Sequence, residues 1–220
     1  MIRIAVGTGK HAKAFKIQQA LLETVSEYFV KALRNKRLGA HPEPGVLRFP
    51  EHCVDAWEAL CYWIFRHELP ATAYEHHYIL AVRCWCLGDK YAIDGFQDEA
   101  LLILLREANS NNLKWEVIEE AVLNSRPGTQ LRRLMAMEVK SQAIDFYSDE
   151  VDGRVLDALD GTGVMREVLE VHQACEKGED RVENWFERDN QLWRTFMIGK
   201  GLGKHWVFRS GSADELTICV

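Results

Sequence analysis

The spacing of the apolar residues changes near residue 20, and this change limits the fold more than any other feature of the sequence. Residues 2–6 and 15–17 alternate with a period of two, as half-buried strands do. Gly7 and Gly9 lie between them and favour a tight turn. Together these residues predict a β-hairpin. A dinucleotide-binding loop requires a helix directly after its glycines, and here a strand follows, so we expect no nucleotide site.

Beyond the hairpin the apolar residues recur at helical spacing. Two short helices are expected at about 18–25 and 27–37, because the hydroxyl of Ser26 can cap a new helix start. A short strand at 46–49 stops at Pro50, and Pro70 is expected to end the helix that follows. Further helical stripes cover 79–87, 96–107, 113–124, 130–147, 164–175 and 182–196. Because strands and helices do not alternate, the pattern predicts an α+β, mainly helical fold, a small sheet with a helical cluster.

Composition places the chain among folded intracellular proteins. It has 220 residues and a formal net charge of −6, which gives no electrostatic reason to expect nucleic acid or an anionic membrane as partner. We expect no signal peptide, and the longest apolar run, residues 100–105, is far shorter than the ~20 residues of a membrane helix. The 6 cysteines are expected to be reduced thiols, several of them in the core.

No spacing typical of a reaction centre or a metal centre was found. Cys84 and Cys86 form a C-x-C pair, but on a helix their side chains point about 200° apart and cannot easily share an ion. His52-Cys53 and His76-His77 are adjacent pairs rather than zinc knuckles, and no nucleophile elbow is present. We therefore predict no catalytic residues, no cofactor and no metal, and expect no small-molecule ligand.

Four blocks of sequence carry a family resemblance. They are FKIQQALLETVSEYFVKAL (15–33), VLRFPEHCVDAWEALCYWIFRHELP (46–70), LGDKYAIDGFQDEALLIL (87–104) and VIEEAVLNSRPGTQLRRLMAMEV (117–139). The first three resemble, in order, the blocks of BTB/POZ domains, and the fourth resembles the helical extension of fungal BTB proteins. The resemblance implies a BTB/POZ-like domain at 1–108, a helical extension at 109–148, and a helical tail with a flexible C-terminus at 149–220.

The resemblance also implies a function, that of a protein–protein interaction module rather than an enzyme. Members self-associate as homodimers or heterodimers, and some are substrate adaptors of cullin-based ubiquitin ligases. Alternatives are a transcriptional or chromatin co-regulator scaffold that does not bind DNA, and an enzyme with a dispersed site. Expected partner contacts are Leu22 and Val25 on the first helix, which often forms family dimers, Glu43 in the loop after the second helix, and Tyr74 and Tyr78 after Pro70.

Overall fold

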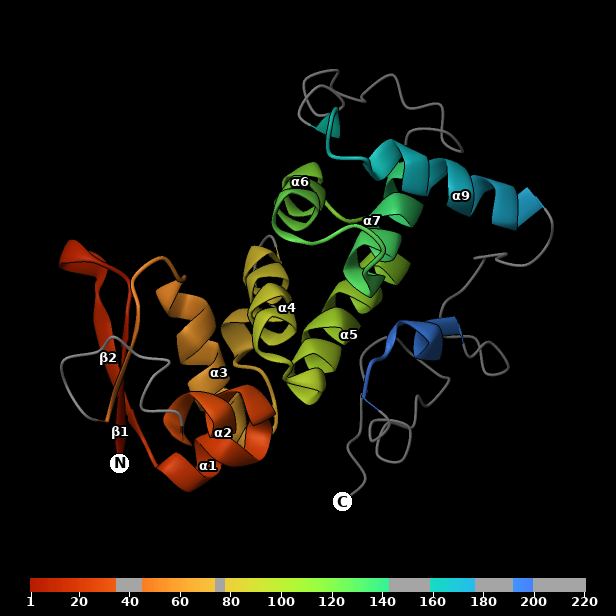
Figure 1. Cartoon of the computed structure of the whole chain (residues 1–220). Coiled ribbons are helices and arrows are strands. Elements are labelled where there is room, and N and C mark those ends of the chain that lie inside the picture. The colour runs from red at the N-terminus through yellow and green to blue at the C-terminus, as the bar shows by residue number, and fades with distance from the viewer. Residues whose placement is uncertain (35–44, 74–77, 143–158, 177–191, 200–220) are drawn as a thin grey trace.

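A three-stranded sheet forms one end of the molecule (Figure 1). The computed structural model describes residues 1–34, 45–73, 78–142, 159–176 and 192–199. Strand β1 (Ile2–Val6) pairs antiparallel with β2 (Lys13–Ile17) and parallel with β3 (Val46–Phe49), in the order β2-β1-β3. The predicted hairpin is confirmed: Gly7 and Gly9 take positive φ angles of 76° and 61°, which glycine adopts at little cost.

Two short helices follow the hairpin, as predicted. Helix α1 (Gln19–Val25) ends at Ser26, and α2 (Glu27–Arg34) begins directly after it. The Ser26 hydroxyl accepts a hydrogen bond from the Tyr28 backbone N–H at 3.0 Å, so the predicted cap is confirmed. The expected extension of the second helix to residue 37 lies outside the described residues. Helix α3 (Val54–Arg66) ends at His67, which has a left-handed φ of 56°, so the prediction that Pro70 ends it was wrong.

Helices α4 (Ile79–Tyr91) and α5 (Asp94–Ser110) form the centre of the molecule (Figure 1). Helix α6 (Trp115–Asn124) packs on α4, and α7 (Gln130–Lys140) packs on α5 and α6. Helix α9 (Val164–Glu176) packs on α7, and a 3₁₀ turn, η4 (Leu192–Phe196), lies against α5. The α+β, mainly helical class is thereby confirmed. None of the helices in the described ranges is both long and apolar enough to cross a membrane.

The core is continuous from the sheet to the last described segment. The predicted boundary between residues 108 and 109 falls inside α5, so this helix belongs both to the predicted first domain and to its extension. The predicted boundary at 148/149 lies outside the described residues. Phe196 was expected on a helical stripe with residues 182–186, but it lies in the 3₁₀ turn, and residues 182–186 are outside the described part.

A buried arginine joins α9 to the body. Arg132 of α7 is 1% exposed, and its Nε lies 2.8 Å from a carboxylate oxygen of Glu167. Its Nη1 donates to the carbonyl oxygen of Val122, and its Nη2 to that of Thr162, both at 2.8 Å. Glu167 also accepts the backbone N–H of Gly128 at 2.8 Å. One side chain therefore links α6, α7 and the start of α9.

Candidate functional site

An aromatic cluster forms the floor of the candidate site, at the junction of α2, β3, α3 and α4. Phe49 stacks on Trp57 with ring centroids 4.6 Å apart, and Phe29 stacks on Tyr91 at 5.4 Å. Trp57 and Tyr91 are 5.8 Å apart, and both are buried. Because these rings come from segments far apart in the sequence, the cluster fixes the relative positions of the elements that surround the site.

His52 lies at the edge of this cluster, and its proton can be assigned from its neighbours. The indole N–H of Trp57 donates to Nδ1 of His52 at 3.0 Å. An indole nitrogen can only donate, so in the neutral imidazole the proton must be on Nε2. Burial, and then the nearby charge of Lys90, lower the pKa of His52 from 6.5. The ring is therefore neutral at neutral pH, with Nε2–H as a donor.

The ammonium group of Lys90 is a second donor, and it lies beside Nε2 of His52. Its Nζ lies 2.9 Å from Nε2 of His52, and the hydroxyl of Tyr91 lies 3.3 Å from that nitrogen. An ammonium group has no lone pair, so Lys90 and the Nε2–H of His52 both present hydrogens to the same space. Within the described ranges no carboxylate lies in salt-bridge contact with Lys90. A ligand oxygen placed beside the pair would accept from both.

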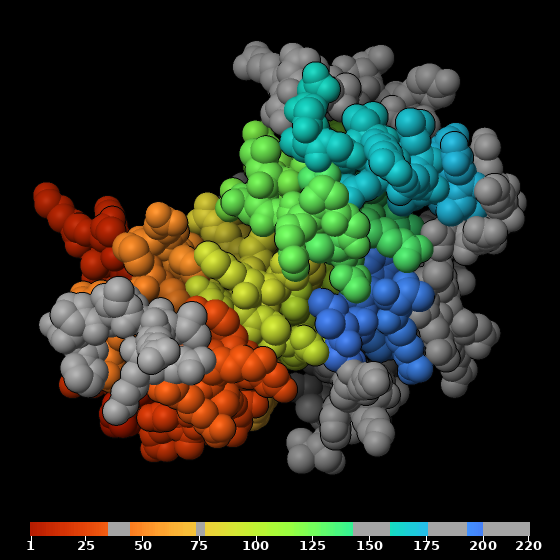
Figure 2. All heavy atoms as spheres, in the orientation of Figure 1, coloured from red at the N-terminus to blue at the C-terminus, as the bar shows by residue number. Residues whose placement is uncertain are grey.

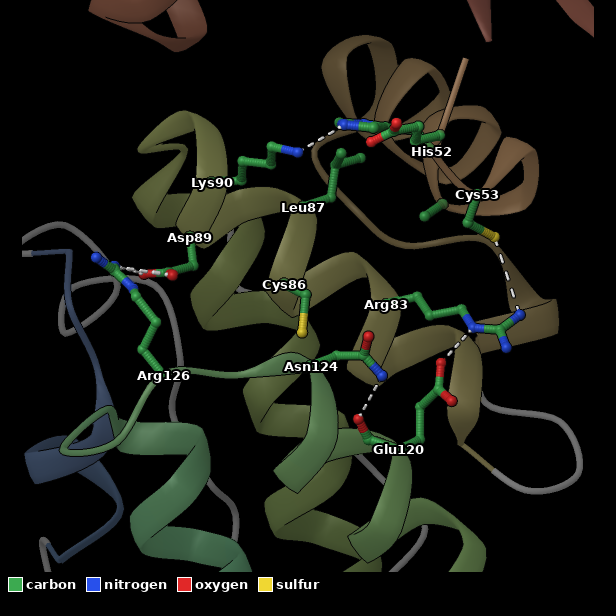
Figure 3. A pocket seen from close by; sticks show the side chains of 12 residues that line it. His52, Cys53, Arg83, Cys86, Leu87, Asp89, Lys90, Glu120, Asn124 and Arg126 are labelled. Atoms are coloured by element: carbon green, nitrogen blue, oxygen red, sulfur yellow. Dashed lines mark hydrogen bonds and ion pairs between the residues drawn. The ribbon is translucent and has the colours of Figure 1, made fainter. Parts of the chain in front are cut away.

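Two hollows meet at this pair. The first, the charged pocket, has a volume of about 860 Å³ and is formed by the start of α3, the outer face of α4 and the end of α6 (Figure 3). The second, the aromatic pocket, has a volume of about 510 Å³. The residues that line both are Glu51, His52 and Lys90. The aromatic pocket is completed by Tyr28, Lys31, Ala32, Leu47, Arg48, Phe49, Pro50 and Tyr91.

Ion pairs hold the walls of the charged pocket. Arg83 Nε lies 2.7 Å from a carboxylate oxygen of Glu120, which joins α4 to α6 (Figure 3). Arg126 Nη2 lies 2.9 Å from both carboxylate oxygens of Asp89. These four charges are therefore already neutralised by one another. The pocket thus leaves Lys90, at its border with the aromatic pocket, as the cation best placed to meet an incoming anion.

The two C-x-C thiols have different surroundings. Cys84 is completely buried, whereas Cys86 is half-buried and faces the charged pocket (Figure 3). Desolvation raises the pKa of the Cys86 thiol to about 12, so it is not a thiolate at neutral pH. Among the described residues no group of three His, Cys, Asp or Glu side chains could hold a metal ion. The pocket offers charge and shape for binding but no activated nucleophile from this thiol.

The expected contact residues that the structure describes, Leu22, Val25 and Tyr78, lie away from both pockets. Leu22 is 0% exposed, because α1 turns it into the core, which corrects the expectation that it faces a partner. Val25 is half-buried and packs against the same core. Tyr78 is also half-buried, and its hydroxyl donates to Glu107 at 2.6 Å; burial raises its pKa to about 12. Glu43 and Tyr74 lie outside the described residues. None of the three described residues lines either pocket.

The sequence reasoning missed the residues that form the site. In the sequence, His52 stands out only through the His52-Cys53 pair, and Lys90 only as part of the third resemblance block. They are 38 positions apart, so no local pattern connects them. The only local signal is that Lys90 precedes the buried Tyr91 near a helix end, which favours a lysine that extends past the ring toward solvent but does not indicate His52.

Comparisons of the sequence with protein-family models and with curated proteins found no match. The family resemblance therefore depends on the four sequence blocks themselves.

Proposed function

We propose that the chain is a protein–protein interaction module of the BTB/POZ type, and that a partner docks in the aromatic pocket with an acidic side chain placed against Lys90 and His52. The observation that carries this proposal is the approach of two donors, Lys90 Nζ and His52 Nε2–H, to 2.9 Å at the border of an aromatic hollow. A carboxylate accepts from both donors and neutralises the cation. The neighbouring aromatic surface suits an apolar anchor next to that acid.

The charges of the aromatic pocket support an acidic partner. Its lining includes three cations, Lys31, Arg48 and Lys90, against one acid, Glu51. Lys31 is paired with Glu27 at 3.2 Å, but both side chains are exposed, so this pair contributes little and is easily exchanged. An excess of positive charge around an apolar hollow favours a segment in which acidic residues flank an apolar one.

The packing of the resemblance blocks supports the BTB/POZ assignment. Ser26 and Phe29 belong to the first block, Trp57 to the second and Tyr91 to the third. The Ser26 hydroxyl donates to the backbone carbonyl of Tyr91, and Phe29 contacts both Trp57 and Tyr91. The residues that carry the resemblance are thus core residues that contact one another, as expected of landmarks of a single fold.

For the partner, the resemblance implies a cullin, which would make the protein a substrate adaptor. The test is calorimetric titration of the full chain with a cullin N-terminal domain. We expect binding that is at least tenfold weaker in Lys90→Glu, because the variant places an acid against the partner's acid. Lys16→Glu, on the exposed face of β2, is the matched control and should bind like the natural chain.

Two results would contradict the proposal in different ways. Absence of binding would remove the cullin as partner. Equal affinity for the natural chain and Lys90→Glu would remove the aromatic pocket as the docking site while leaving an interaction module. Self-association is tested separately by light scattering of the full chain over a concentration series.

A further inference from the structure

Helix α5 is buried around its whole circumference between Phe96 and Leu105. Helices α4 and α7 cover two of its sides, and residues 192–199 cover part of a third (Figure 1). Figure 2 shows this segment, in blue, seated against the yellow-green surface of α5 and the green surface of α7. The segment is separated from α9 by residues 177–191 in the sequence, so its position on α5 is a tertiary contact.

Two aromatic side chains anchor the segment. Trp193 is 5% exposed and Phe196 is 1% exposed, although they belong to a single 3₁₀ turn that could not bury them by itself. The guanidinium of Arg133, on α7, lies 5.4 Å from the centroid of the Phe196 ring. The anchors are three residues apart, so in a 3₁₀ turn both side chains lie on the same side of the segment, where Phe196 meets Arg133 of α7.

A buried carboxylate fixes the end of the segment. Asp98 of α5 is 0% exposed and accepts the backbone N–H groups of Ile198 and Gly199, both at 2.7 Å. A Cβ at position 199 would lie 2.9 Å from a carboxylate oxygen of Asp98, so a larger residue there would force the carboxylate to shift away from the two N–H groups. These contacts define a pattern, Trp-x-x-Phe-x-x-Gly, that the helices recognise.

The buried carboxylate of Asp98 is tolerated in the fold only because hydrogen-bond donors reach it. A buried charge without hydrogen-bond partners is strongly unfavourable, and the donors that satisfy Asp98 are main-chain groups rather than side chains of the helices. A buried acid that accepts two successive main-chain N–H groups, beside two buried aromatic side chains of the same segment, is an arrangement suited to binding a peptide. In this structure the chain's own segment is the bound peptide.

We propose that the face of α5 and α7 around Asp98 and Arg133 is a peptide-docking groove, that residues 192–199 occupy it as an internal ligand, and that a partner peptide with the pattern Trp-x-x-Phe-x-x-Gly displaces them. The tether gives the internal segment an effective concentration of about 1 mM or more, so a free peptide competes poorly with it. Cutting the tether removes this advantage and leaves the intrinsic affinity of the groove.

The experiment uses the full chain with a protease site inserted between residues 177 and 191. After cleavage and removal of the released C-terminal fragment, a fluorescent synthetic peptide with the sequence of residues 190–200 is titrated, and its anisotropy is measured. We expect saturable binding, at least tenfold tighter than to the uncut protein. Peptides with Phe196→Ala or Gly199→Ala should lose at least tenfold in affinity, and a scrambled peptide of the same composition is the matched control.

Binding to the cut protein should also weaken when Asp98→Asn is introduced, because the neutral amide is a poorer acceptor for two N–H groups. Circular dichroism after cleavage reports whether the remaining chain stays folded. A cut protein that remains folded but binds the natural and scrambled peptides equally would overturn the proposal. One that unfolds when the fragment leaves would also overturn it, because residues 192–199 would then be part of the fold. Neither result would affect the aromatic pocket, which lies on other elements.

Discussion

Replacement of Arg132 by methionine is the sharpest test of how α9 is held. The natural side chain is almost completely buried and makes three hydrogen bonds, to Glu167, to the carbonyl of Val122 and to the carbonyl of Thr162. Methionine fills much of the same volume but donates nothing. The variant therefore leaves two backbone carbonyls without this donor and leaves a mostly buried carboxylate without its cation.

The magnitude follows from these three losses. A buried acceptor that loses its partner costs about 1–3 kcal/mol, and removal of one member of a buried ion pair costs about 3–5 kcal/mol. Because the losses share one side chain and the carbonyls can recruit water, they do not add in full. We expect Arg132→Met to lower the free energy of unfolding by about 3–5 kcal/mol. In a chain of this length this corresponds to a decrease in Tm of about 6–20 °C.

The assay is guanidinium unfolding followed by far-UV circular dichroism, with Tm as a second measure. Arg166→Met is the matched control, because the Arg166 side chain is 86% exposed and pairs with Glu170 across one helical turn. It should change the free energy of unfolding by about 0.5 kcal/mol or less. A cost below about 1 kcal/mol for Arg132→Met would refute the reasoning, since a buried arginine with three partners cannot be removed so cheaply.

Three further predictions concern His52, Glu99 and Ser26. The folded-state pKa of His52 is lowered from 6.5, so the stability that its neutral ring contributes is fully present above pH 6.5 and is lost as the pH falls through the folded-state pKa. The Tm should therefore decline less between pH 7.5 and 5 in His52→Asn than in the natural chain. Burial raises the pKa of Glu99 from 4.5 to about 7, so the stability that its protonated side chain contributes is present below pH 4.5 and is lost as the pH rises to 7. Glu99→Gln should therefore be more stable than the natural chain at pH 8, by up to about 3 kcal/mol, and equal stability in urea at pH 8 would contradict this. Ser26→Ala removes the cap of α2 and the bond to the Tyr91 carbonyl, and should cost about 1–3 kcal/mol in the same urea assay, against about 0.5 kcal/mol or less for the exposed Thr24→Ala.

Local features were predictable wherever one short segment determines its own structure. Gly7 and Gly9 take the positive φ angles that a hairpin turn requires, and the hydroxyl of Ser26 caps α2 as its position between two helical stripes indicates. The end of α3 was missed because the helix stops at His67, which takes a left-handed conformation three residues before the proline at position 70.

The candidate site was not predictable, because it depends on contacts across the fold. Trp57 sets the tautomer of His52 by its indole N–H, and Lys90 reaches the other ring nitrogen from the end of α4. Nothing in the spacing of these residues indicates that their rings and ammonium meet. Arg132 is a similar case, since an arginine in a helical stretch is ordinarily expected on a solvated face.

Helix α5 shows most directly why buried polar residues are not predictable from the sequence. Gln97, Asp98 and Glu99 are three consecutive polar residues, a pattern that normally indicates exposure, yet all three are buried. A helix that is buried on every side has no solvent-exposed face, so the spacing of its apolar residues does not show which of its residues are buried. Asp98 is accommodated because backbone donors arrive from residues 198 and 199, 100 positions or more along the chain. The burial of Asp98 is therefore explained by the segment that covers it, and a change at Asp98 should first alter how residues 192–199 bind.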